Sequence, residues 1–360
     1  MIVKSLELNH FRNYESLNIA FDQGTNILYG NNAQGKTNIL EAIYLSGTTK
    51  SHKGSKDREM VQFGNEESHI RLFVEKQEKQ FQIDMHLKKH KSKGIAVNRI
   101  PIKKAGELFG ILTLVFFSPE DLNIIKNGPS ERRRFMDMEL CQLDRIYFDN
   151  LTKYNKILMQ RNKLLKDIYT KPELKETLFA WNIQLTEYGK KIIQRRREFV
   201  SRLDEIVADI HAKISGGTET VTLTYEPNVK EEDFERELER VREKELKLGQ
   251  TMTGPHRDDI SFLSNDIDIR KFGSQGQQRT LALSLKLSEI ELVKQITKET
   301  PILLLDDVLS ELDSKRQNFL LNNLCDTQTI ITCTGLDEFI RNRFHINRVF
   351  EVKDGTVHMR

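Results

Sequence analysis

The 360 residues are enough for one large domain with an insertion or for two domains, and 38% hydrophobic with 30% charged residues is ordinary for a soluble globular protein. The longest uncharged apolar runs are far too short to span a bilayer, and the N-terminal residues lack the apolar core of a signal sequence. These features favour a cytoplasmic protein without a membrane partner. The three cysteines include no Cys-x-x-Cys pair, so neither a disulfide framework nor a zinc site is indicated.

The formal net charge of +3 says little about partners, because the distribution of charge matters more. Residues 151–200 carry 12 Lys and Arg against 5 Asp and Glu, and the run Lys88–Lys93 is basic without an acidic residue. Residues 231–245 have an acidic excess. Basic stretches of this kind suit nucleic-acid phosphates, but they are equally common as solvated helix faces and hairpin tips.

In chain order, alternating apolar and polar residues predict two strands, Ile2–Leu8 and Leu17–Phe21, joined by a turn that contains Arg12 and Asn13. A third, short strand, Ile27–Tyr29, leads directly into a loop of phosphate-binding pattern. The loop consists of Gly30, Asn31, Asn32, Ala33, Gln34, Gly35, Lys36 and Thr37.

This loop has the residues that nucleotide binding requires. Its two glycines let successive backbone N–H groups point at one anion, and the helix predicted to follow, to about Leu45, adds its partial positive charge. Lys36 reaches the β- and γ-phosphates, and Thr37 ligates Mg²⁺. A glycine-rich turn can match the pattern by chance, but the flanking strand and helix supply the expected context. The sequence therefore predicts a site for ATP and Mg²⁺.

The next residues continue the β-rich region. Residues 69–87 are typical of a strand pair, Gly94–Val97 adds a further strand, and Leu112–Phe117 is a strongly β-prone run that ends where Ser118 and Pro119 begin a helix. From about residue 120 to 248 the apolar spacing becomes helical. The predicted helices cover roughly 131–168, 174–213 and 231–247, with a short strand at 221–225. We therefore predict an inserted, mainly helical lobe (120–248) in an α/β domain formed by residues 1–119 and 249–360.

The last third contains two further motifs. Ser274–Arg279 begins a helix that extends to about Lys298, and the Ser274 hydroxyl, the Gly276 backbone and the helix N-terminus offer a second anion site. An ordinary serine-capped helix start explains this stretch equally well when it is taken alone.

The second motif is a buried strand, Pro301–Leu305, that ends in two carboxylates. Asp306 at the strand end can hold Mg²⁺, and Asp307 can orient or deprotonate an attacking water. In a chain that also has a phosphate loop, this pair favours nucleotide hydrolysis over a simple capped strand end.

The phosphate loop, Ser274–Gln277 and Asp306–Asp313 occur in the order typical of ABC-type ATPases of the SMC and Rad50 kind. Within that class the chain resembles the RecF family of bacterial recombination mediators, with hallmarks spread over nearly its whole length. The resembling stretches are Phe11–Tyr14, Phe117–Glu120, Arg132–Phe135, Thr253–Asp258 and Leu305–Asp313. One departure is Asn127, where the family usually has glycine.

The resemblance implies a mixed-sheet ATPase head that works as an ATP-dependent homodimer. ATP on Lys36 of one subunit would be capped by Ser274, Gly276 and Gln277 of the other. It also implies that Arg12 and Asn13 lie near the nucleotide. Asp313 would cross the dimer interface and Thr334 would approximate a switch position.

DNA is the implied substrate surface, bound without sequence specificity near single-strand gaps, with RecR and RecO as partners and RecA loaded downstream. The candidate phosphate contacts are Lys88, Lys89, Lys91, Lys93, Arg132, Arg133, Arg134, Arg195, Arg196 and Arg197. An alternative interpretation of Arg132–Arg134 is structural, with pairs to nearby Glu131, Asp137 or Glu139.

Three other functions are compatible with parts of this pattern. A transporter ATPase subunit is disfavoured by the Arg-rich insertion and the Ser-Gln-Gly-Gln signature. A Rad50-like tether needs a long coiled coil and a Cys-x-x-Cys hook, which this sequence lacks. A nucleotide kinase does not require the second anion site at Ser274.

Overall fold

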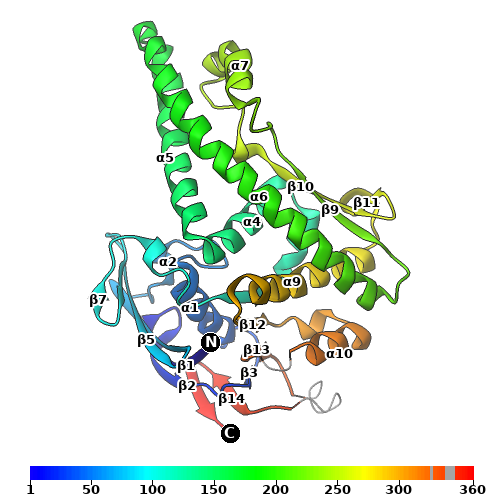
Figure 1. Ribbon diagram of the computed structural model, residues 1–360. Helices are drawn as coiled ribbons and strands as arrows, with labels where there is room; N and C mark the ends of the chain where they lie inside the picture. The colour runs from blue at the N-terminus through cyan, green and yellow to red at the C-terminus, as the bar shows by residue number, and fades with distance from the viewer. Residues whose placement is uncertain (325–326, 337–344) are drawn as a thin grey trace. The chain divides into compact units, whose positions relative to one another are not determined.

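A computed structural model describes residues 1–324, 327–336 and 345–360 (Figure 1). The chain forms two compact units. The first unit combines residues 1–121 with residues 286–360, and the second unit contains residues 122–285.

The first unit contains an antiparallel sheet of six strands in the order β2-β1-β4-β5-β6-β7. Apolar residues alternate along the long strands and are buried on one face, as expected for a sheet with one face in the core. The strands predicted in this region are confirmed, and several are longer than their predicted cores. Their bounds are β1 (Ile2–Phe11), β2 (Tyr14–Ala20), β4 (Glu67–Lys76), β5 (Lys79–Lys88), β6 (Gly94–Val97) and β7 (Ile100–Pro101).

A second sheet of the first unit has the order β15-β14-β3-β13-β12-β8. Its strands pair in parallel except for β15, which is antiparallel to β14. Residues 302–305 are fully buried, which fits a strand covered on both faces. The bounds are β3 (Thr25–Tyr29), β8 (Leu114–Phe117), β12 (Ile302–Asp306), β13 (Thr329–Cys333), β14 (Arg348–Lys353) and β15 (Thr356–Met359).

Helix α1 (Lys36–Thr48) packs against strands of both sheets, β4 and β5 in one and β8, β12 and β13 in the other. Its side chains are buried on nearly every side, as expected for a helix between two layers. The shorter helices of this unit are α2 (Asp57–Met60), η1 (Ala105–Glu107), η2 (Pro119–Asp121), η5 (Leu309–Glu311) and α10 (Ser314–Asn322).

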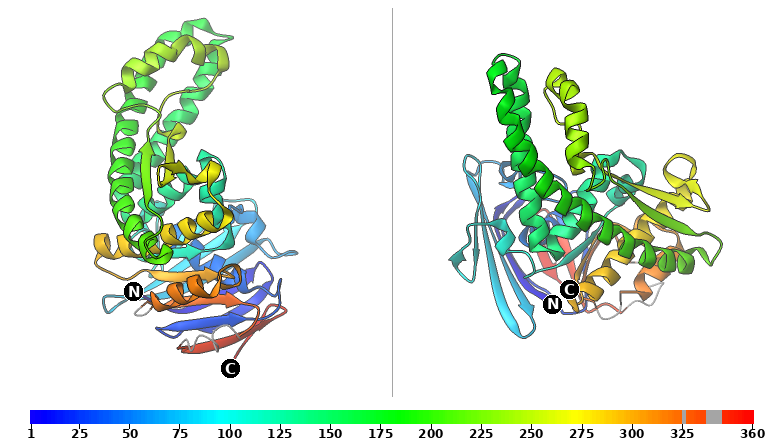
Figure 2. Two further views of the ribbon diagram at one scale, coloured as in Figure 1. Left: turned by 90° about the vertical axis from the view of Figure 1, so that its right-hand side faces the viewer. Right: turned by 45° about the horizontal axis from the view of Figure 1, so that its top comes forward.

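The second unit consists of helices around a small sheet. Helices α5 and α6 lie side by side along its arm (Figure 2), and a sheet of order β11-β10-β9 packs against α6 and α4. The helices are α3 (Leu122–Lys126), α4 (Pro129–Leu143), α5 (Arg145–Ile168), η3 (Pro172–Thr177), α6 (Leu178–Ser215), α7 (Phe234–Leu248), η4 (Pro255–Arg257) and α8 (Ile269–Phe272). The strands are β9 (Val221–Glu226), β10 (Asp259–Ser264) and β11 (Ile267–Asp268). Helix α9 (Gln275–Thr297) contains the boundary between the two units.

The structure differs from the sequence prediction in two places. The helix predicted over 131–168 is divided at Asp144, whose carboxylate accepts hydrogen bonds from the N–H groups of Ile146 and Tyr147 and so begins α5. Residues 249–285 group with the second unit, although the predicted lobe ended at 248. The reason is strand pairing: β9 before that boundary pairs along its whole length with β10 after it.

Asn127, the departure from the family pattern, lies in a bend before α4 and does not adopt a positive φ. The turn therefore does not require glycine at this position. Among the described residues, no helix is both long enough and apolar enough to cross a bilayer.

Candidate nucleotide-binding site

The phosphate loop follows β3 and ends where α1 begins. Gly30 and Gly35 have φ angles of +153° and +113°, which side-chain-bearing residues rarely adopt. Added Cβ atoms would also clash, at 2.3 Å from the Val352 carbonyl oxygen for Gly30 and 2.5 Å from the Asn13 amide nitrogen for Gly35. Gly30 is therefore required by backbone conformation and by space, and Gly35 by backbone conformation.

Neighbouring turns hold this loop in place. The Asn13 amide donates a hydrogen bond to the Gln34 carbonyl at 3.0 Å, and the Tyr14 hydroxyl donates to the Gly35 carbonyl at 3.1 Å. The Gln34 side-chain oxygen accepts from the N–H of Asp354 at 2.6 Å, which joins the loop to the β14–β15 turn. Asn13 therefore lies beside the loop, and its predicted proximity to the nucleotide stays a prediction. The support from Asp354 carries no signal in the sequence. Tyr14 belongs to the Phe11–Tyr14 stretch that resembles the family, but its contact with the loop is not predicted from the sequence.

Lys36 is the buried cation of the loop, with 7% of its surface exposed. Its ammonium group donates to the carbonyl of Gly30 and, at 2.9 Å, to that of Asn31. Burial lowers the pKa of Lys36, while the nearby carboxylates Asp307 and Asp306 oppose that shift. A lysine held by the loop's own carbonyls can turn toward a phosphate without a large movement of the backbone.

Residues far apart in the chain meet beside the loop. The Thr37 hydroxyl donates to Oδ1 of Asp306 at 2.7 Å, and the Thr332 hydroxyl donates to the same oxygen at 2.8 Å. Strands β12 and β13 are adjacent and parallel, which brings Asp306 and Thr332 into register. A hydroxyl and a carboxylate in contact offer the hard oxygen ligands that Mg²⁺ prefers, so Thr37 and Asp306 fit this ion.

Asp307 lies next to this pair in a strained backbone conformation, with φ of +52°. Its N–H donates to the Thr332 hydroxyl at 3.0 Å, and the Ser310 hydroxyl donates to its carbonyl at 2.8 Å. Burial raises the pKa of the Asp307 carboxyl, and the Asp306 charge adds to the rise while Lys36 opposes it. A carboxylate with a raised pKa beside a cation is suited to proton abstraction.

Ser274 lies at the start of α9, in the second unit. Its N–H donates to the Gln277 side-chain oxygen at 2.9 Å, and the N–H of Gln277 donates back to the Ser274 hydroxyl oxygen at 3.2 Å. This reciprocal pair is a capping box. Ser274 and Gly276 are exposed, so the same helix start also remains open to a ligand. Both interpretations of this stretch agree with the geometry.

Two further residues assigned from the family pattern, Arg12 and Asp313, have local partners. Arg12 donates hydrogen bonds from all three of its guanidinium nitrogens. Nε and Nη2 donate to the buried carboxylate of Glu41 at 2.8 and 2.7 Å. Asp313 is the N-cap of α10 and accepts from the N–H of Arg316 at 3.0 Å. Thr334 is an exposed residue in the bend after β13. Their roles toward nucleotide or a second subunit stay predictions.

The prediction of a DNA contact is wrong for two arginines, because their guanidinium groups are buried in the second unit. Arg132 is 0% exposed and forms a bidentate pair with Asp259, with Nε to Oδ1 at 2.5 Å. Arg196 is 2% exposed and pairs with Asp137 at 2.8 Å and Asp258 at 2.9 Å. The structural interpretation holds for Arg132, although its partner is Asp259 instead of a neighbour in sequence.

The other basic candidates divide by their contacts. Arg133 is half-buried and donates to the Asp258 carbonyl at 2.7 Å, and Arg195 pairs with Asp144 at 2.8 Å. Both are held by the second unit, which argues against a primary role in DNA binding. Arg134 and Arg197 are exposed.

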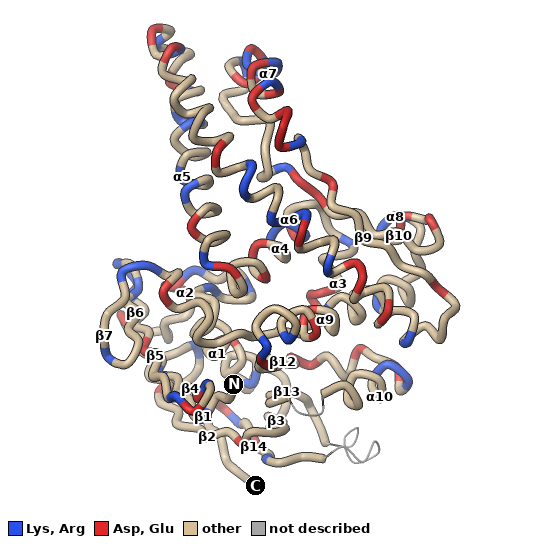
Figure 3. The backbone as a smooth tube through the Cα atoms, in the orientation of Figure 1, with Lys and Arg blue, Asp and Glu red and all other residues tan. Residues whose placement is uncertain are grey.

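In the loop after β5, Lys93 donates to the Thr49 carbonyl at 2.6 Å and to Asp57 at 2.8 Å, so it anchors the loop. Lys89 lies 3.5 Å from Glu66 and can exchange that exposed partner for a phosphate. Lys88 and Lys91 remain candidates. Along α6 and α7, Lys and Arg are interspersed with Asp and Glu (Figure 3), which suits solvated helix faces.

The buried position of Arg196 makes a prediction about stability. Arg196→Met should destabilise the second unit by about 3–5 kcal/mol, because it leaves the buried Asp258 carboxylate without its cation. The matched control is Arg197→Met, which removes an exposed pair with Glu231 and should cost about 0–1 kcal/mol. Urea unfolding followed by circular dichroism measures both. Equal losses for the two variants would contradict the buried network.

The sequence matches known proteins over nearly its whole length. A family profile described as the RecF/RecN/SMC N terminal domain matches residues 2–358. The DNA replication and repair protein RecF of Agathobacter rectalis is 66% identical over 357 residues, and that of Lachnospira eligens is 63% identical over 359 residues. Each match covers 99% of both chains.

Solved structures agree with this similarity. The structures described as the recombination mediator protein RecF with ATPrS and with ATP, in the RecFOR pathway, have TM-scores of 0.92 and 0.91 at 36% identity. They cover 99% of this chain and 98% and 97% of their own chains. An Smc head domain from Pyrococcus furiosus, at 17% identity and a TM-score of 0.58, shares the fold. By sequence and by structure, the chain belongs to the RecF family of SMC-like ABC-type ATPases.

Proposed function

We propose that this chain is an ATP-dependent recombination mediator whose homodimer holds DNA while nucleotide is bound. The observation that carries the proposal is the contact between Thr37 and Asp306, which joins the phosphate loop to the carboxylate pair. ATP binds with its phosphates over residues 30–37, and Thr37 and Asp306 hold Mg²⁺. Held there, the ion would offset phosphate charge, while Lys36 orients the γ-phosphate and Asp307 accepts the proton of the attacking water.

The second subunit completes the site in this proposal. The exposed Ser274 hydroxyl, the Gly276 N–H and the α9 dipole present a ready anion site that faces the γ-phosphate of the opposite subunit. ATP then favours the closed dimer, because both subunits bind one γ-phosphate, and hydrolysis removes that shared contact. ATP hydrolysis by the monomer is slow. DNA stimulates hydrolysis by bringing two subunits together.

The proposed substrate is DNA near single-strand gaps, in the cytoplasm. Lys88, Lys89 and Lys91, in and after β5, remain the candidate phosphate contacts in the first unit. The solved relatives are named as mediators in the RecFOR pathway. RecR and RecO are therefore the proposed partners, with RecA loading in gap repair, replication restart and the SOS response as the outcome.

Sedimentation velocity with ADP and with ATP, plus and minus duplex DNA, tests the composite site. Wild-type protein should dimerise with ATP only, and Ser274→Arg should stay monomeric because a bulky cation occupies the capping position. Ser201→Arg, which places the same side chain on an exposed face of α6, is the matched control and should dimerise normally. A wild-type protein that hydrolyses ATP as a monomer in the presence of DNA would exclude the two-subunit site.

A further inference from the structure

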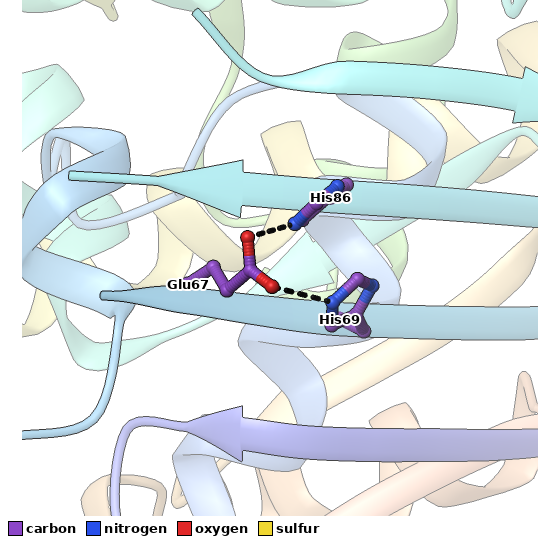
Figure 4. A group of neighbouring side chains, drawn as sticks. All are labelled: Glu67, His69 and His86. Atoms are coloured by element: carbon purple, nitrogen blue, oxygen red, sulfur yellow. Dashed lines mark hydrogen bonds and ion pairs between the residues drawn. The ribbon is translucent and has the colours of Figure 1, made fainter. Parts of the chain in front are cut away.

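Two histidines and a glutamate lie together on the exposed face of the six-stranded sheet (Figure 4). His69 on β4 is directly opposite His86 on β5, and Asn9 on β1 and Gly94 on β6 extend the same row. Residues opposite one another in antiparallel strands point to one face, and so do residues two apart in one strand. Glu67, two residues before His69, therefore shares that face.

The three side chains are close enough to share one ion. Nε2 of His86 lies 2.8 Å from the Glu67 carboxylate, and Nε2 of His69 lies 3.8 Å from it. All three donor atoms lie within 4.8 Å of one another. Donors bound to one tetrahedral zinc ion at 2.0–2.1 Å are separated by about 3.3 Å. Side-chain rotations alone would bring this set to those separations.

The donor types also suit a metal. Imidazole nitrogens and a carboxylate oxygen are among the ligands that bind zinc.

The surroundings leave room for a fourth ligand. The histidines line a shallow cavity of about 400 Å³ whose other walls include Arg71, Asp84 and Gly94. Gly94, opposite His86 on β6, contributes no side chain to this face.

Two cations share this face of the sheet. Arg71 pairs with Asp84 at 2.6 Å and with Glu7 at 3.2 Å, which offsets its charge. Lys88, opposite Glu67, is the cation that competes with a metal for that carboxylate.

We propose that Glu67, His69 and His86 bind one zinc ion, with water in the fourth position. The ion links β4 to β5 beside Lys88, where β5 leads into the loop of residues 89–93. This site is independent of the proposed ATPase cycle.

Titration of the full chain with zinc chloride tests the proposal, with zinc followed by a chromophoric chelator and with excess Mg²⁺ occupying oxygen-rich sites. Wild-type protein should bind one more equivalent of zinc than His69→Ala/His86→Ala. His358→Ala, which removes another exposed histidine of the same unit, is the matched control and should keep that equivalent. Cobalt at this site should show the visible absorption of tetrahedral coordination, and the double variant should lose it.

Glu67→Gln provides a second variant that keeps the shape of the side chain. It should weaken zinc binding by at least about 100-fold, because a ligand loss exceeds the 10- to 100-fold cost of losing a supporting residue. The thermal midpoints of all variants without zinc should equal that of the wild type, since these side chains lie outside the core. Equal zinc stoichiometry in wild type and the double variant, or wild-type binding only at millimolar zinc, would overturn the site.

Discussion

Replacing Lys36 by alanine is expected to lower ATP hydrolysis by about 10²–10³-fold or more, the scale for removing one preorganised charge-stabilising donor. The ammonium group is the buried cation of the loop, and it lies where the β- and γ-phosphates are proposed to bind. Its removal leaves developing negative charge on the phosphoryl oxygens without a partner. Steady-state release of inorganic phosphate, together with equilibrium ATP binding, measures the effect on catalysis and on affinity.

The matched control for this variant is Lys50→Ala, which removes an exposed lysine just after α1. It changes the net charge of the protein equally and should leave hydrolysis unchanged. The role of Lys36 would be refuted if its variant hydrolysed ATP at the rate of the control. Circular dichroism of both variants shows whether the fold is retained, so a loss of activity can be assigned to the site.

Asp307→Asn is expected to lower ATP hydrolysis by about 10²–10⁴-fold, the usual contribution of a positioned base, while ATP binding is retained. The amide keeps the shape of the side chain but cannot accept the proton of the attacking water. Because hydrolysis opens the proposed clamp, ATP should trap this variant as a dimer that sediments faster than wild type with ADP. Phosphate release and sedimentation velocity on the same samples measure the two effects.

The exposed residue Asp354 provides the control, because Asp354→Asn retains the backbone N–H that supports the Gln34 side chain. This variant should hydrolyse ATP normally. Full activity of Asp307→Asn would remove Asp307 from the mechanism and leave proton transfer to another group.

The pKa of Asp307 also predicts the pH dependence of the wild-type enzyme. Burial raises this pKa above the ordinary range of an aspartate, so the carboxylate loses its basic form while the pH is still above that range. The rate constant for hydrolysis should therefore rise with pH through the raised pKa and level off above it. The residual activity of Asp307→Asn should lack this step. The pH profile at saturating ATP measures both.

Features that depend on neighbouring residues could be predicted from the sequence. The phosphate loop, the apolar strand before Asp306 and the alternating strands of the first unit are local patterns, because turn geometry and side-chain period act over a few residues. The SMC-like fold followed from the order of these motifs along the chain. The structure bears out this fold, and the comparisons bear out the family.

Features that depend on strand order and burial could not be predicted from the sequence. The pairing of β9 with β10 moved the domain boundary from 248 to 285, and nothing local marks a strand as the partner of another 38 residues later. The sequence analysis places Arg132 and Arg196 among the candidate DNA contacts, because a buried arginine differs from an exposed one only in its partners. Those partners, Asp259 and Asp258, lie far along the chain.

The sequence by itself determined which chemical groups this protein has for phosphate binding and hydrolysis, because Gly30–Thr37 and Asp306–Asp307 each carry their chemistry in consecutive residues. Only the tertiary structure decided that these groups meet. The parallel register of β3, β13 and β12 brings Thr37, Thr332 and Asp306 within hydrogen-bonding distance across 269 residues of chain. The hairpin register of β4 and β5 likewise places His69 beside His86, because contacts between distant residues depend on pairing that no local pattern specifies.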